Sequence, residues 1–132
     1  MNESVILVLR SKDLVLCEWR DFRGTQQNCL PGGAVEDLDR QHNDYIGAAA
    51  VREAAEELGI TVEPGRILGE FTSEAVRFHV MLVESWTGEI PTSNRDNENE
   101  LKWMPLERFA PSIRIEPLKQ IIETLMSAPL PP

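Results

Sequence analysis

The chain has 132 residues, a length that predicts a single domain spanning residues 1–132. Its residues are 42% hydrophobic and 27% charged, which is typical of a globular protein. Its net charge of −9 excludes a nucleic-acid polymer as a simple electrostatic partner. No apolar run reaches the ~20 residues of a membrane span, and the N-terminal MNESVILVLR lacks the basic region of a signal peptide. With two cysteines that form neither a metal-type spacing nor a disulfide framework, we expect a cytoplasmic protein without a membrane partner.

The first predicted elements are two apolar, β-rich runs at residues 4–9 and 14–19, separated by the polar stretch 10–13. This pattern predicts a β-hairpin. The polar segment 20–28 is expected to be a loop that leads into the turn Pro31-Gly32-Gly33. Two glycines in a turn let a backbone approach closely and can direct a carbonyl toward an ion.

The run at residues 45–58 is rich in Ala, Glu and Leu and predicts a helix, with Asp44 or Asn43 as its N-cap and Gly59 as its stop. At 100° per residue, three carboxylates share one side of this helix. They belong to Glu53, Glu56 and Glu57. We expect the opposite side to face the core, through Gly47, Ala48, Val51, Ala54, Ala55 and Leu58.

Two interpretations of this acidic side compete. It is either a solvated helix surface or the ligand set of a cation, since like charges at this spacing repel each other when nothing positive lies between them. Oxygen-only ligands suit Mg²⁺, which also takes phosphate oxygens from a substrate. The glycine turn, the neighbouring Arg52 and a second acidic group at Glu36, Asp37 and Asp39 favour the cation site.

The second half of the chain predicts a strand pair at 66–72 and 77–86, a polar loop at 87–99, a strand at 101–106 and an amphipathic helix at 115–126. Both sides of the 77–86 strand are partly apolar, which is typical of a sheet covered on two faces. His79, on that strand, has no Cys or His partner at ligand spacing, so we expect a structural histidine. The proline-rich tail 127–132 is expected to fray.

The stretch at residues 30–60 resembles the signature of the Nudix hydrolase family, G-xxxxx-E-xxxxxxx-R-E-U-x-E-E-x-G-U, where U is a bulky aliphatic residue. The matching residues are Gly33, Arg52, Glu53, Glu56, Glu57, Gly59 and Ile60. There are two departures. Ala54 stands at an aliphatic position, and five extra residues separate Gly33 from Arg52, so that either Asp39 or Asp44 replaces the first signature glutamate.

The resemblance implies an α/β fold, namely a Nudix-type α/β/α sandwich with a mixed β-sheet, a signature loop and helix, and a C-terminal helix. It implies Mg²⁺- or Mn²⁺-dependent hydrolysis of a phosphoanhydride bond in a nucleoside diphosphate linked to another group X. The small size of the chain favours a nucleoside triphosphate as the substrate. The implied metal ligands are Gly32, Glu53, Glu56 and Glu57, and Arg52 would orient a glutamate. The general base would be a signature glutamate or one of Glu98 and Glu100, which precede Trp103.

Substrate contacts are less marked in the sequence. Arg20 and Arg23 lie where a loop could reach phosphates, and Phe78, Trp19 or Trp103 could stack on a base. A competing interpretation is a catalytically silent Nudix-fold module that binds a nucleotide or a protein, which the long loop and Ala54 favour. Because members of the family often dimerise, the resemblance also allows a homodimer. An unrelated domain with an acidic helix is the third reading, and the glycine turn argues against it.

Overall fold

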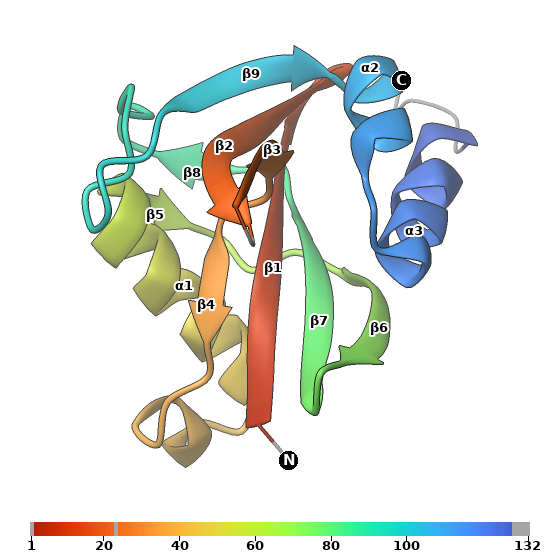
Figure 1. Cartoon of the computed structure of the whole chain (residues 1–132). Coiled ribbons are helices and arrows are strands. Elements are labelled where there is room, and N and C mark those ends of the chain that lie inside the picture. The colour runs from red at the N-terminus through yellow and green to blue at the C-terminus, as the bar shows by residue number, and fades with distance from the viewer. Residues whose placement is uncertain (1, 23, 128–132) are drawn as a thin grey trace.

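The computed structural model describes residues 2–22 and 24–127, which form three layers (Figure 1). A mixed seven-stranded sheet lies between helix α1 (Tyr45–Leu58) on one face and helices α2 (Leu106–Phe109) and α3 (Glu116–Ser127) on the other. The order across the sheet is β3-β2-β1-β7-β6, with β4 paired to β1 and β9 paired to β2. The predicted α/β/α sandwich with a mixed sheet is confirmed.

The centre of the sheet is a parallel pair, β1 (Asn2–Ser11) beside β7 (Val76–Val83). Strand β6 (Ile67–Ser73) lies antiparallel to β7, which confirms the predicted strand pair. Residues 79–83 of β7 are all buried, so both faces of this strand are covered. His79 is one of them, and it bonds to two carboxylates of the sheet, as expected for a structural histidine.

One edge of β1 is divided between two neighbours. The predicted hairpin with β2 (Leu14–Phe22) is confirmed, but its pairing is confined to the turn, at Arg10↔Val15 and Ser11↔Leu14. Closer to the N-terminus, β4 (Gly32–Ala34) takes the place of β2, with Val5 opposite Gly33. A Cβ at Gly32 would overlap the Val5 carbonyl oxygen, so only glycine fits there. This division places the glycine strand directly before the loop that leads to α1.

The expectation of a loop at residues 20–28 is wrong. Strand β2 continues through this region and turns at Gly24 into β3 (Thr25–Cys29), with Trp19 opposite Asn28 and Arg20 opposite Gln27. Strand β3 is at the edge of the sheet and is only partly buried. Its polar side chains therefore have no apolar alternation, which is the signal on which a strand prediction depends.

Helix α1 has the predicted limits. Asp44 is the N-cap, because its Oδ1 accepts a bond of 3.0 Å from the Gly47 amide, and Gly59 ends the helix in the left-handed conformation at φ 66°. The predicted core side is only partly correct. Gly47, Ala54 and Leu58 are buried, but Ala55 is exposed and Ala48 and Val51 are half-buried. The buried side also includes residues that were not predicted to face the core, namely Ile46, Ala49, Ala50, Glu53 and Glu57. Two of the three carboxylates thus face the glycine strand rather than solvent.

The remaining elements are a small second sheet, the last strand of the main sheet, two short 3-10 turns and the C-terminal helix. A small ribbon of β5 (Thr61–Val62) and β8 (Trp86–Thr87) follows α1, and β9 (Leu101–Pro105) confirms the predicted last strand. Short 3-10 turns lie at Asp39–Gln41 (η1) and Ala110–Ser112 (η2). Helix α3 confirms the predicted C-terminal helix, and residues 128–132 of the predicted tail lie outside the described residues.

The apolar core has two parts, one on each face of the sheet. Ala50, Ala54 and Leu58 of α1 pack against Leu7 and Leu9 on the first face. Leu118, Ile122 and Leu125 of α3 pack against Val8, Val80 and Leu82 on the second. Within the described residues, no helix is both long and apolar enough to cross a membrane.

Candidate functional site

The glycine strand β4 and helix α1 form the site together, because the glycines leave room for carboxylates between them. Glu53 is only 7% exposed, and a Cβ added at Gly33 would overlap all three atoms of its carboxyl group. Glu57 is equally buried, whereas the Glu56 side chain is 53% exposed. The helix therefore presents two buried carboxylates and one open carboxylate to the glycine strand.

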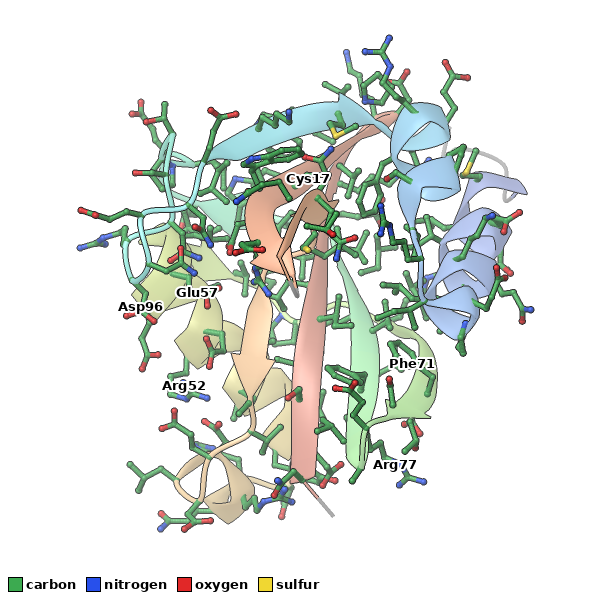
Figure 2. All side chains as sticks on the ribbon, in the orientation of Figure 1. Cys17, Arg52, Glu57, Phe71, Arg77 and Asp96 are labelled. Atoms are coloured by element: carbon green, nitrogen blue, oxygen red, sulfur yellow. The ribbon has the colours of Figure 1, made fainter. Side chains whose placement is uncertain are left out.

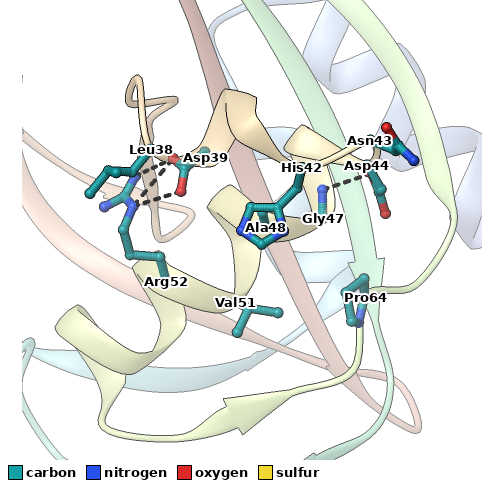
Figure 3. Close-up of a pocket in the computed structure, with 10 residues that line it drawn as sticks. All are labelled: Leu38, Asp39, His42, Asn43, Asp44, Gly47, Ala48, Val51, Arg52 and Pro64. Carbon is teal, nitrogen blue, oxygen red and sulfur yellow. Dashed lines mark hydrogen bonds and ion pairs between the residues drawn. The ribbon is translucent and has the colours of Figure 1, made fainter.

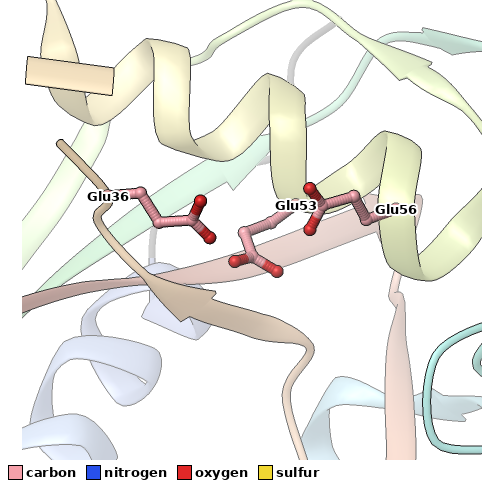
Figure 4. A group of neighbouring side chains, drawn as sticks. All are labelled: Glu36, Glu53 and Glu56. Atoms are coloured by element: carbon pink, nitrogen blue, oxygen red, sulfur yellow. The ribbon is translucent and has the colours of Figure 1, made fainter. Parts of the chain in front are cut away.

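Three carboxylates converge between helix α1 and the loop that follows β4 (Figure 4). They belong to Glu36, Glu53 and Glu56, and one oxygen atom of each lies within 4.8 Å of the other two. Arg52 explains this arrangement, since its Nη1 lies 3.0 Å from an oxygen of each of the three residues. The bonds use Oε1 of Glu53 and Oε2 of Glu56, so among the described residues the second oxygen of each stays available to a cation.

The guanidinium of Arg52 is itself held in place from the other side. Asp39 in η1, only 4% exposed, accepts bonds from Nε and Nη2 of Arg52, and Nη2 also donates to the Ala34 carbonyl at 2.8 Å. The hydrogen bonds to Asp39 are the main reason that the pKa of Arg52 is raised, and they hold the pKa of Asp39 below its ordinary value. Of the two candidate aspartates, Asp39 contacts Arg52 and Asp44 caps the helix.

Glu57 is the carboxylate that lacks a positive partner. Its Oε2 is buried and has no hydrogen-bond partner among the described residues. Burial is the largest cause that raises the pKa of Glu57 to about 7, and the charges of Glu53 and Glu18 add to it. Burial raises the pKa of Glu53 as well. A buried acceptor without a donor is rare in folded proteins, and a bound ion or an ordered water would satisfy it.

The donor set fits a hard divalent cation. Glu53, Glu56 and Glu57 offer only oxygen atoms, and Gly32 adds a backbone carbonyl on the adjacent strand. Mg²⁺ and Mn²⁺ prefer such ligands and keep open positions for water or phosphate. Bound there, an ion would supply the positive charge that Oε2 of Glu57 lacks.

The segment that follows β8 reaches the other end of α1 (Figure 2). The Arg95 amide donates to the Glu57 carbonyl at 2.7 Å, and the Arg95 side chain lies against Gly59. Glu98 and Glu100, the candidate bases, lie on this segment with exposed side chains. The structure therefore brings their backbone next to α1, but their carboxylates are not in the group formed by Glu36, Glu53 and Glu56.

The candidate substrate residues have different surroundings. Arg20 pairs with the buried Glu18 and is near enough to Glu57 for its charge to lower the pKa of that carboxyl. Arg23 lies outside the described residues. Phe78 stacks on Phe71 with ring centroids 5.1 Å apart, on the face covered by α3 rather than by α1.

The two tryptophans differ from each other. Trp103 stacks on Trp86 with ring centroids 5.9 Å apart and packs against the core on the α1 side. Trp19 is 39% exposed, and Lys102 Nζ lies 5.3 Å from its ring centre. Trp103 is thus a half-buried residue that packs against the core, whereas Trp19 is exposed.

Two acidic residues were not among the predicted site residues. Glu36 was read only as part of a second acidic group, and it bonds to Arg52. Glu18 is completely buried on β2, beside Arg20. A single glutamate within the apolar run LVLCEW was the available signal for Glu18, because a charge in a buried strand needs specific partners.

A hollow of about 530 Å³ lies outside this acidic site (Figure 3). The extra loop residues and the outer side of α1 line it, including Leu38, His42, Val51 and Pro64. Arg52 and Asp39 border it, but Glu53, Glu56 and Glu57 do not. The hollow is thus separate from the group of carboxylates.

Comparisons with known proteins agree with this geometry. The NUDIX domain family model matches residues 2–125. The solved E. coli ORF135 protein has a TM-score of 0.76 and 22% identity, over 96% of this chain and 91% of that one. A MutT structure, from work on Aliivibrio salmonicida and Vibrio cholerae, has a TM-score of 0.73 and 24% identity, over 93% of this chain and 98% of that one. A protein named ADP compounds hydrolase has a TM-score of 0.73 and 12% identity, over 95% of this chain and 71% of that one.

Identities this low show a shared fold, whereas the family match covers nearly the whole chain. It runs from β1 to α3 and includes the glycine strand, Arg52 and all three carboxylates of α1. As the signature predicted, the chain belongs to the NUDIX domain family.

Proposed function

We propose that this Nudix hydrolase cleaves a phosphoanhydride bond in a nucleoside diphosphate linked to a further group, with Mg²⁺ or Mn²⁺ as its cofactor. The observation that carries the proposal is Glu57, whose buried Oε2 has no hydrogen-bond partner among the described residues and whose pKa is raised further by the charge of Glu53. A negative site of this kind repels a polyphosphate unless divalent cations lie between the two.

The ligands of the cation would be Glu53, Glu56, Glu57 and the Gly32 carbonyl. A bound ion would neutralise phosphate charge and lower the pKa of a bound water. Arg52 does not need to touch the substrate, because its bonds to Glu53 and Glu56 fix the direction of those two carboxylates. Asp39, which accepts a hydrogen bond from Arg52, would take the place of the first signature glutamate.

A carboxylate would take the proton from the attacking water. The candidates are Glu57 on the helix, and Glu98 and Glu100 on the segment that bonds to it. The amide of Arg95 on the Glu57 carbonyl supports the second pair, since it fixes that segment against the end of α1. Arg20, beside Glu57, is the proposed phosphate contact, and Arg23 is a further candidate. Phe78, half-buried on Phe71, would stack on the base from the α3 side.

A nucleoside triphosphate is the first substrate to test. The names of the structural neighbours include MutT and ADP compounds hydrolase, so adenosine diphosphate conjugates belong in the same panel. The assay measures phosphate and pyrophosphate release from each nucleotide with Mg²⁺. We expect turnover of at least one of them by the parent protein.

The matched variant is Glu57→Gln, which keeps the size of the side chain and removes its charge. Its rate should fall by about 100-fold or more, because one of the few ligands of a catalytic ion is lost. Equal rates in parent and variant would remove Glu57 from the mechanism. No turnover on any nucleotide, together with stabilisation by Mg²⁺, would favour a silent module that binds nucleotides or proteins.

A further inference from the structure

Glu18 has no place in the signature, yet four side chains among the described residues donate hydrogen bonds to it. Its side chain is completely buried on β2. Three asparagine side chains donate to it, from Asn94 at 2.7 Å, Asn99 at 3.1 Å and Asn97 at 3.3 Å. Arg20 donates a fourth bond through Nε.

A carboxylate without solvent costs several kcal/mol unless its oxygens are bonded. Here burial by itself would raise the pKa of Glu18, but the bonds from Arg20 and the asparagines outweigh it and hold the pKa below its ordinary value. Glu18 is therefore an anion inside the protein. Three of its four donors come from residues 94–99. The negative charge of Glu18 therefore holds that segment in particular.

Asn94 links Glu18 to the backbone of the segment. It is completely buried, and its Oδ1 accepts bonds from the amides of Asp96 at 2.8 Å and Asn97 at 3.3 Å. Its carbonyl accepts the Glu98 amide at 2.8 Å, although Glu98 has an unfavourable positive φ of 65°. The segment thus has a defined shape that depends on the orientation of the Asn94 side chain.

The same segment is attached to the signature helix. The Arg95 amide donates to the Glu57 carbonyl, and the Arg95 side chain lies over Gly59 where α1 ends. At its far end, the Glu100 carbonyl accepts the Trp19 amide at 2.9 Å, next to Glu18 on β2. A continuous set of contacts therefore runs from Glu18 through residues 94–100 to the backbone of Glu57.

We propose that Glu18 is a positioning residue whose buried carboxylate holds residues 94–100 against the C-terminal end of α1. By this means it sets where Glu98 and Glu100 stand relative to Glu57. The effect on catalysis rests on the proposed function, whereas the effect on the segment does not. Glu18 itself touches neither substrate nor cation.

The direct test is hydrogen exchange of the amides of residues 94–101 in the metal-free protein, comparing the parent with Glu18→Gln. Glutamine keeps one acceptor oxygen and has an NH2 donor in place of the other, so the donors that bond to that second oxygen lose their acceptor, and Arg20 loses a charged partner. We expect faster exchange throughout this segment and a partial return of protection in Glu18→Asp, which keeps the charge. Unchanged exchange in Glu18→Gln would overturn the proposal.

Glu3→Gln is the matched control, because Glu3 is a half-buried carboxylate with three side-chain partners, Arg40, Tyr45 and His79, none of them in this segment. It should leave exchange at residues 94–101 as in the parent. Equal acceleration by both variants would show a general loss of stability and would also overturn the proposal. If Glu18→Gln does not fold, Asn94→Ala and Asn99→Ala remove one donor each and take its place in the same comparison.

Kinetics separate the role of Glu18 from that of the ligands. On the best nucleotide, Glu18→Gln should lower kcat by about 10- to 100-fold, with little change in KM or in the dissociation constant for Mn²⁺ measured by electron paramagnetic resonance. Loss of Mn²⁺ affinity equal to that of Glu57→Gln would show that Glu18 acts on the cation site instead. If the parent turns over no nucleotide, the proposed function fails, and the exchange comparison still decides the role of Glu18.

Discussion

Arg52 donates to Asp39 across the loop that separates the glycine strand from the signature helix, with Nη2 2.9 Å from Oδ2. Five residues, from Arg40 to the cap Asp44, separate Asp39 from the helix, and this chain exceeds the signature by the same number. The bond to Arg52 spans this separation. Asp39 reaches the arginine from η1, and Asp44 starts the helix instead.

The two aspartates give a matched pair of variants. Asp39→Ala should lower kcat/KM by about 10- to 100-fold, because Arg52 loses the partner that fixes its bonds to Glu53 and Glu56. Asp44→Ala should lower the free energy of unfolding by about 1 kcal/mol through loss of the cap, and leave kcat/KM near the parent value. Nucleotide hydrolysis and urea denaturation measure the two effects. The reverse pattern would assign the signature role to Asp44.

Gly33→Ala tests the space between the strand and the helix. The added methyl group overlaps the carboxyl end of Glu53, which is flexible, rather than the backbone. We therefore expect a folded protein with an unchanged circular dichroism spectrum in which the Glu53 carboxylate is displaced. Hydrolysis should fall by about 100-fold, since small displacements of catalytic groups have effects of this size. A fully active, folded Gly33→Ala protein would show that Glu53 does not need its observed position.

The raised pKa of Glu57 predicts a pH dependence of stability without metal. The pKa is 4.5 for the ordinary side chain and about 7 in the folded protein, so ionisation is harder after folding. The contribution of Glu57 to the free energy of unfolding should therefore fall as pH rises from about 4.5 to about 7, by about 3 kcal/mol in total. Below this window the group is protonated in both states and costs nothing.

Other carboxylates have lowered pKa values and act in the opposite direction, so the measurement is a difference between proteins. Urea denaturation of the parent and of Glu57→Gln, both with a chelator, isolates the contribution of Glu57. The variant should gain stability over the parent as pH rises to 7. A constant difference between pH 4 and pH 8 would show that burial does not raise the pKa of this carboxylate.

Mg²⁺ should stabilise the fold because it binds the folded site and relieves the repulsion between the carboxylates. At tens to hundreds of times the dissociation constant, the gain is about 2–3 kcal/mol by mass action. Thermal denaturation with and without Mg²⁺ measures it. Glu57→Gln should respond much less, and an equal rise in Tm for both proteins would place the bound ion elsewhere.

The sequence was sufficient to predict the elements that have a periodic apolar pattern or a specific end signal. The helix at 45–58, with Asp44 before it and Gly59 after it, is an example. The expected core side of this helix was partly wrong, because a helical wheel assigns carboxylates to solvent by default. Glu53 is buried because Gly33 leaves room for its carboxyl group, which is a tertiary contact that periodicity does not encode.

The missed features share this cause. Strand β3 pairs with β2 through its backbone and carries polar side chains, so its sequence is that of a loop. Glu18 stands out only as a charge within an apolar strand, and its three asparagine partners lie more than seventy residues later. Which asparagines reach a given glutamate depends on the path of the chain between them, and this path is a property of the fold.

The central claim is that the carboxylates of α1 act through a divalent cation on a phosphoanhydride. The most direct measurement is the hydrolysis rate of the best nucleotide during a Mg²⁺ titration, for the parent and for Glu57→Gln. The account predicts no turnover in the parent without Mg²⁺, a saturable rise with Mg²⁺, and a rate lower by about 100-fold or more in the variant. Turnover by the parent in the presence of a chelator, or an equal rise for both proteins, would contradict it.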